Sequence, residues 1–121
     1  MFPEKPTRQT WFPYDNKSTI GGVITAFEWE DVPEQHQATS IESNTCKKID
    51  GKWKRLVVDY YRDGRERFPT RTVMTSSMFQ DFQQYEIKVG DGFQLRVSGY
   101  HKKSGSPVIR AYKRTKKWLD R

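Results

Sequence analysis

Alternation of apolar and polar residues near the C-terminus is the feature that most constrains the fold of this chain. In the segment GDGFQLRVSGYHKKSGSPVIRAYKR, residues 90–114, two alternating runs flank a polar turn that contains glycine. Because successive side chains of a strand point to opposite faces of a sheet, this pattern predicts a β-hairpin with one buried face. The residues assigned to that face are Phe93, Leu95, Val97, Ile109 and Ala111.

A second hairpin and a short helix precede this segment. Residues 52–76 are rich in β-branched and aromatic residues, and Asp63-Gly64 is a strong turn signal between two strands. In SMFQDFQQY the apolar residues then recur at helical spacing, and either Ser76 or Ser77 can cap the start. The pattern therefore predicts two strands followed by a short helix.

The N-terminal half predicts one strand and one long loop. In STIGGVITAFEWEDV, β-branched and aromatic residues indicate a strand, and Gly21-Gly22 marks an expected bulge or sharp bend. Residues 31–50 are polar and lack periodicity, so we expect a long loop, or a loop with one short element. Loops of that length in a compact domain tend to be functional.

The order of these elements predicts the fold class. Five strands with a small helix between the third and fourth form the arrangement of an all-β, five-stranded Greek-key OB-fold barrel. A chain of 121 residues is near the usual size of one domain. We expect residues 1–17, which contain prolines and aromatic rings, to form an N-terminal arm, and residues 18–121 to form the OB-fold domain.

The distribution of charge indicates an anionic partner. The formal net charge is +7, but residues 1–51 carry five bases against eight acids, whereas residues 52–121 carry seventeen bases against seven acids. The basic half coincides with the predicted hairpins and their aromatic residues. Solubility alone is the competing explanation for the surplus of bases. We favour a polyanion that binds the basic half.

The C-terminal hairpin also resembles a known family. GDGFQLRVSGY, with its Gly90-Asp91 turn and the strand that follows, resembles the fourth strand of nucleic-acid-binding OB domains, and SPVIRA resembles the fifth. Over about residues 18 to 118 the chain is similar to OB-fold single-stranded DNA-binding proteins. The resemblance implies an OB barrel that binds single-stranded DNA.

Candidate binding residues follow from the chemistry of single strands, which bind through cations at the phosphates and flat rings at the bases. If Leu56 faces the interior, alternation places Arg55 and Tyr61 outward, and Tyr61 is the best stacking candidate. On the last strand, Tyr112 shares its face with Arg110 and Arg114.

The predicted nucleic-acid-binding residues lie in the two hairpins, where cations and rings are interleaved. They are Lys52, Trp53, Lys54, Arg55, Tyr61, Arg62, Arg65, Arg67, Arg71, Arg96, Tyr100, Lys102, Lys103, Arg110, Tyr112 and Arg114. Packing in the core or at its rim is the competing interpretation for each single ring. Core packing is expected for Trp29, Phe68, Phe79, Phe82 and Phe93, and the sequence leaves Trp53 and Trp118 open.

Several other kinds of site are not expected. Cys46 is the single cysteine, which excludes an intramolecular disulfide and a cysteine-based zinc site. His36 and His101 are read as solvated loop residues, without metal-ligand spacing. The acidic cluster is read as a solvated edge rather than a site for a divalent ion; it comprises Glu28, Glu30, Asp31 and Glu34. Because no catalytic motif is present, we expect no enzymatic activity, no cofactor and no metal.

The expected function is therefore sequence-tolerant binding of single-stranded DNA in replication, recombination or repair, in a phage, plasmid or bacterial accessory protein. The alternatives are an RNA-binding OB protein and a protein-interaction OB module of a replication or translation assembly. Self-association and docking on a replication protein also stay open. Since the sequence shows neither a secretory signal nor a membrane span, a cytoplasmic protein without membrane contact is expected.

Overall fold

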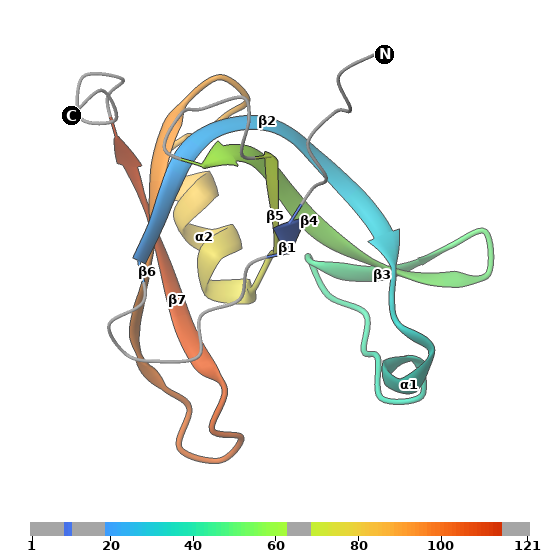
Figure 1. Ribbon diagram of the computed structural model, residues 1–121. Helices are drawn as coiled ribbons and strands as arrows, with labels where there is room; N and C mark the ends of the chain where they lie inside the picture. Colours follow the sequence, from blue (N-terminus) through green and yellow to red (C-terminus); the bar gives the residue numbers. More distant parts are fainter. Residues whose placement is uncertain (1–8, 11–18, 63–68, 115–121) are drawn as a thin grey trace, which may run out of the picture.

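The computed structural model of the chain describes residues 9–10, 19–62 and 69–114 (Figure 1). The strands and helices, in chain order, are β1 (Gln9–Thr10), β2 (Thr19–Asp31), α1 (Glu34–Gln37), β3 (Cys46–Ile49), β4 (Lys52–Arg62), β5 (Pro69–Val73), α2 (Ser76–Gln84), β6 (Gly92–Tyr100) and β7 (Pro107–Arg114). In this part of the chain the strands form one sheet in the order β1-β5-β4-β2-β6-β7, and β3 pairs with β4 beside that path. The prediction of an all-β protein is confirmed.

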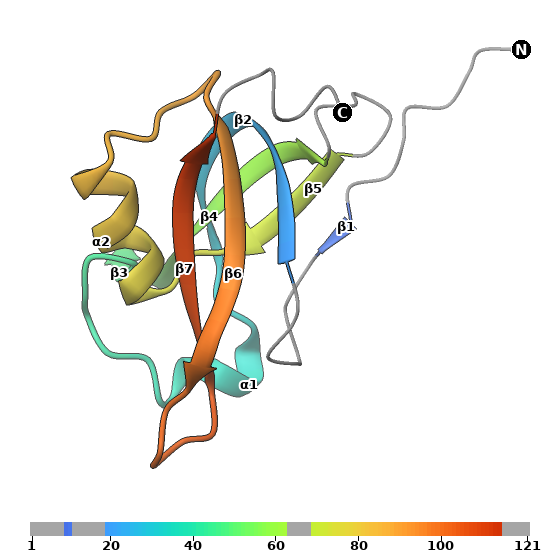
Figure 2. The ribbon, with the colours of Figure 1, turned by 90° about the vertical axis from the view of Figure 1, so that its left-hand side faces the viewer.

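The sheet curls into a half-barrel because its central strand is strongly curved (Figures 1 and 2). The first residues of β2 pair with β6, and its later residues pair with β4. The two pairings overlap at Gly22 and Val23, and a β-bulge follows between Ile24 and Ala26. There the Ile24 N–H donates to the Asp91 carbonyl at 3.0 Å, and the Ile24 carbonyl accepts from the Gly90 N–H at 2.8 Å. The turn before β6 thus satisfies the peptide groups of Ile24, one residue beyond the part of β2 that pairs with β6.

The glycine pair in β2 does not form this bulge, which was expected at Gly21-Gly22. A Cβ atom at Gly22 would lie 2.2 Å from the carbonyl oxygen of Tyr61. Glycine is therefore required at position 22 because the backbones of β2 and β4 approach each other closely.

The core lies between the sheet and α2, on what we call the inner face of the sheet. Phe93 is in its centre, in edge-on contact with Tyr60 at 4.9 Å and with Phe82 at 5.8 Å between ring centroids. All five hairpin residues assigned to the buried face are buried, as are Leu56 and Val58. On the opposite, outer face of β4, however, Val57 and Asp59 are buried too. This strand therefore exposes fewer outward side chains than its alternation predicts.

Helix α2 covers the edge of β7. The Ser77 hydroxyl donates to the Ile109 carbonyl at 2.8 Å, and a carboxylate oxygen of Asp81 accepts from the Ala111 N–H at 3.0 Å. Polar side chains of the helix thus take the place of a neighbouring strand and form hydrogen bonds with peptide groups of the edge strand β7. The helix itself is capped by Thr75, whose hydroxyl accepts from the Met78 N–H, rather than by a serine.

The segment 31–50 contains two short elements, α1 and β3, where at most one was expected. Asp50 and Gly51, at φ values of 51° and 78°, form the turn between β3 and β4. Both residues have the positive φ that a two-residue type I′ hairpin turn requires. The loop therefore closes with a third hairpin.

Several predictions fall outside the described residues. These are the arm of residues 1–17 apart from β1, the Asp63-Gly64 turn, Phe68 and Trp118. Within the described ranges, neither helix has the length and apolar character needed to cross a membrane.

Candidate nucleic-acid interface

A three-stranded extension of the sheet carries the first group of rings and cations. We call it the limb; it consists of residues 27–31 of β2, 46–49 of β3 and 52–56 of β4. The pairing register aligns Lys47 with Lys54, and Lys54 with Asp31. Because side chains alternate along each strand, these residues and Trp29 share the inner face.

On the inner face of the limb a lysine lies against a tryptophan. The Lys47 ammonium is 4.5 Å from the centre of the Trp29 ring, within the range of a cation–π interaction. Lys54 forms an ion pair with Asp31, and the hydrogen bond from Lys54 holds the pKa of the Asp31 carboxyl below its usual value. Lys52 is exposed at the end of the same face. This face therefore combines one partly buried ring with Lys47 and Lys52, neither of which forms an ion pair among the described residues.

The outer face of the limb repeats the arrangement. The Lys48 ammonium lies 5.4 Å from the centre of the half-buried Trp53 ring. Arg55 lies beside Glu30, with 3.5 Å between Arg55 Nε and a carboxylate oxygen. The predicted residues of this segment thus divide: Lys52 and Lys54 lie on the inner face, whereas Trp53 and Arg55 lie on the outer one.

The hairpin of β6 and β7 carries the second group. Arg96 is exposed and is the cross-strand neighbour of Arg110. The Arg110 guanidinium donates to Asp81 at 2.7 Å, and the Asp81 side chain is only 1% exposed. Arg110 thus neutralises a buried carboxylate, which gives it a role in stability, whereas Arg96 is available to solvent.

At the end of β7 the predicted pair Tyr112 and Arg114 is in contact. The Arg114 guanidinium carbon is 5.4 Å from the Tyr112 ring centre, and two of its nitrogens donate to the Gln94 side-chain oxygen at 3.2 and 2.9 Å. Tyr112 and Arg114, together with Tyr85 and Lys113, line a shallow cavity of about 220 Å³. Two rings, a guanidinium and an ammonium therefore meet at one surface depression.

The turn between β6 and β7 supplies further cations. Tyr100, Lys102 and Lys103 are exposed there, and the His101 N–H closes the turn by donating to the Ser106 carbonyl at 2.9 Å. This turn and the loop that contains α1 extend in the same direction from the curved sheet (Figures 1 and 2). We call this side of the molecule, where residues 32–51 and 101–106 lie, the mouth.

Arg71, a predicted binding residue, is instead part of an ion-pair network. Its guanidinium donates to both carboxylate oxygens of Asp59, at 2.7 and 2.9 Å, and also to Glu28. The hydrogen bonds to Asp59 raise the pKa of Arg71, and its side chain is only 16% exposed. A cation held in this way on the outer face has little capacity left for phosphate.

The remaining predicted residues lie apart from both groups or outside the described ranges. Tyr61 is half-buried and Arg62 is exposed at the far end of β4. Arg65 and Arg67 fall outside the described residues. Within those residues, no cluster of three or more histidine, cysteine or carboxylate side chains could hold a metal ion; His36 and His101 are both exposed.

Lys47, Lys48 and Trp29 were missed as binding candidates. Trp29 packs against the core margin rather than inside it, and Lys47 and Lys48 belong to a strand that was read as loop. The Asp50-Gly51 dipeptide is a hairpin signal that predicts this strand and its register. That register aligns Lys48 with Trp53, so this pair follows from the hairpin signal, whereas the pair of Lys47 and Trp29 also depends on the register between β2 and β4.

Comparisons with known proteins supply no relative. Neither a protein-family model nor a curated protein nor a solved structure matches the chain. A functional proposal therefore rests on the rings and cations of the sheet itself.

Proposed function

We propose that this protein binds single-stranded DNA with little sequence preference and acts in replication, recombination or repair. The observation that carries the proposal is the pair of ring and cation on the inner face of the limb, Lys47 over Trp29; similar pairs lie on the outer face, Lys48 over Trp53, and at the end of β7, Arg114 over Tyr112. Single-strand binders use rings to stack bases and cations to follow phosphates. In each pair the ring and the cation are close enough together to contact the base and the phosphate of one nucleotide.

The proposal includes an OB-fold arrangement for the curled sheet, with β2, β4, β5, β6 and β7 as its five strands. In support, β2 is central and pairs with β4 on one side and β6 on the other, and α2 follows β5. In an OB-fold, the loops after the first strand and before the fifth border the ligand site. Here those loops are residues 32–51 and 101–106, which lie at the mouth.

The distribution of exposed cations favours a DNA strand that crosses the mouth. Among the described residues, the exposed cations that form no ion pair include Lys47 and Lys52 on the limb and Lys102 and Lys103 on the opposite turn. The bound phosphates would run from one group to the other, past the inner face of the limb. Each contact releases condensed counterions, so affinity depends on salt.

A competition assay tests the choice of ligand. Labelled oligo(dT) bound to the full chain is displaced with unlabelled single-stranded DNA, single-stranded RNA of the same length, and duplex DNA. The proposal predicts that single-stranded DNA competes best and duplex least. If RNA or duplex competes better than single-stranded DNA, the proposed ligand is wrong.

A further inference from the structure

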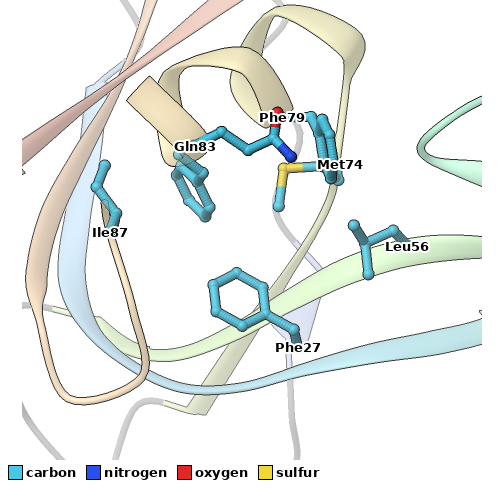
Figure 3. A pocket seen from close by; sticks show the side chains of 7 residues that line it. Phe27, Leu56, Met74, Phe79, Gln83 and Ile87 are labelled. Atoms are coloured by element: carbon cyan, nitrogen blue, oxygen red, sulfur yellow. The ribbon is translucent and has the colours of Figure 1, made fainter. Parts of the chain in front are cut away.

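An apolar cavity lies beside α2, on the inner face of the sheet where the limb begins. Its volume is about 200 Å³, and β2, β4 and α2 contribute to its walls (Figure 3). The lining residues are Phe27, Leu56, Met74, Phe79, Phe82, Gln83 and Ile87. None of these residues belongs to the predicted binding set, and the cavity is distinct from the ring and cation pairs described above.

The walls of the cavity suit a flat ring. Phe27 on β2 faces Phe79 and Gln83 of α2 across the space, and Leu56 and Ile87 lie at its sides (Figure 3). Among the described residues, Gln83 is the single polar side chain in the lining, and its amide extends along the cavity toward Met74. Gln83 is also exposed, so the cavity opens to solvent beside it.

The size of the cavity limits what it can hold. Pockets for drug-sized ligands measure roughly 300–1,000 Å³. A volume of about 200 Å³ is smaller and accommodates a single planar ring. The one carboxamide in an otherwise apolar lining provides a donor and an acceptor for the edge of such a ring.

The surroundings point to a nucleotide as the source of that ring. Phe27 and Trp29 are two positions apart on β2 and therefore share the inner face. The Lys47 ammonium lies over the neighbouring Trp29, and Lys52 is exposed farther along the same face. A base in the cavity would thus have its phosphate on the side where the limb carries positive charge.

We propose that the cavity binds one unstacked thymine base of the single strand, with Gln83 recognising its edge. This inference rests on the proposed function and adds a preferred base at one position. Thymine carries an apolar C5-methyl group, which matches the apolar walls. A carboxamide is complementary to the thymine N3–H and its neighbouring carbonyl. Proteins commonly bind unpaired bases by ring contacts combined with edge hydrogen bonds.

Oligo(dT) and oligo(dU) on the same deoxyribose backbone test the methyl contact, because they differ by that group alone. Burial of one methyl-sized group predicts about fourfold tighter binding of oligo(dT) to the full chain. Gln83→Phe fills the cavity from an exposed helix position, and Gln84→Phe is the matched control on the adjacent exposed position, outside the lining. The ratio of the oligo(dT) affinity to the oligo(dU) affinity should fall to about one in Gln83→Phe and stay near four in Gln84→Phe.

A second variant tests the edge contact. Gln83→Met keeps the length of the side chain but removes the amide, so affinity for both oligomers should fall about fivefold, equivalent to one net hydrogen bond. The ratio of oligo(dT) to oligo(dU) affinity should persist. Thermal unfolding of each variant checks that the fold is retained.

The possible outcomes separate this inference from the proposed function. If the parent protein binds oligo(dT) and oligo(dU) equally, the cavity does not hold thymine, while single-strand binding stands. If the ratio of oligo(dT) to oligo(dU) affinity is unchanged in Gln83→Phe, the inference is likewise wrong. An apolar side chain of a partner protein would then be the favoured occupant of the cavity. If neither oligomer binds the parent, the proposed function itself fails.

Discussion

Lys47 lies over the Trp29 ring on the inner face of the limb, whereas the adjacent Lys48 lies over Trp53 on the outer face. Two neighbouring lysines of one β-strand thus pair with two different rings, and both lysines are exposed. In the proposed function, a DNA strand that crosses the mouth would pass the inner face of the limb. Substitution of one lysine or the other therefore tests which face of the limb the bound DNA strand contacts.

We predict that Lys47→Ala weakens binding of oligo(dT) and reduces the slope of log K against log salt by about 0.7, the value for one lost phosphate contact. Lys48→Ala should leave the slope close to that of the parent. Fluorescence anisotropy titrations at four salt concentrations measure both slopes. The reverse order of effects would place the strand on the outer face.

Arg110 and Arg96 are predicted to differ in role although both were predicted binding residues. Arg110→Ala leaves the buried Asp81 carboxylate with the Ala111 N–H as its remaining donor among the described residues, which should lower the free energy of unfolding by about 1–3 kcal/mol. Arg96→Ala removes an exposed cation and should change stability by less than about 0.5 kcal/mol. Urea denaturation compares the two variants. Equal stability of Arg110→Ala and the parent would show that the ion pair is dispensable.

Gly22 is predicted to be intolerant of any side chain. In Gly22→Ala the new methyl group meets the Tyr61 carbonyl oxygen at 2.2 Å, so β2 and β4 must separate, at a cost of about 3 kcal/mol. Gly99→Ala is the control, since a Cβ there meets no atom within 4 Å. Both free energies of unfolding can be measured in urea. A stable Gly22→Ala protein would contradict the close approach of these strands.

The buried Tyr60 predicts a loss of stability at alkaline pH. Burial raises the pKa of Tyr60 above its ordinary value of 10.0, while its hydroxyl lies 2.8 Å from that of Thr72. The folded state therefore keeps a proton that the unfolded chain releases. Stability from this group is complete below pH 10 and falls by about 1.4 kcal/mol per pH unit above it, until the folded pKa is reached.

Tyr60→Phe should abolish this part of the alkaline decline, at a cost near neutral pH of about 1–3 kcal/mol because the buried Thr72 hydroxyl loses its partner. Tyr61→Phe, at the adjacent half-buried position, should retain the decline. Urea denaturation between pH 8 and pH 12 measures the three profiles. Identical slopes for the parent and Tyr60→Phe would exclude Tyr60 as the titrating group.

Much of the fold follows from local patterns in the sequence. Alternation in residues 90–114 predicts β6, β7 and their buried residues, and helical spacing predicts α2. The strand β3 was missed because two of its four residues are adjacent lysines, which hide any apolar alternation. Beside the bulge in β2, Ile24 is hydrogen-bonded to Gly90 and Asp91, and the pattern around position 25 does not indicate these distant partners.

The candidate site is harder to predict because charge alone does not reveal partners. Arg71 and Arg110 look like phosphate ligands in the sequence, yet each pairs with a buried carboxylate that lies 12 and 29 positions away, respectively. The cavity beside α2 is assembled from segments far apart in the chain, so spacing along one element does not indicate it. Only the register of the folded sheet places Lys47 beside Trp29.

The most direct test of the central proposal is a titration of labelled oligo(dT) with the full chain at several salt concentrations. We predict binding at low salt, with log K falling linearly as log salt rises, since phosphate contacts release counterions. The slope divided by about −0.7 gives the number of phosphate contacts. No binding at low salt, or an affinity indifferent to salt, would contradict the proposal that this protein binds single-stranded DNA through its basic surface.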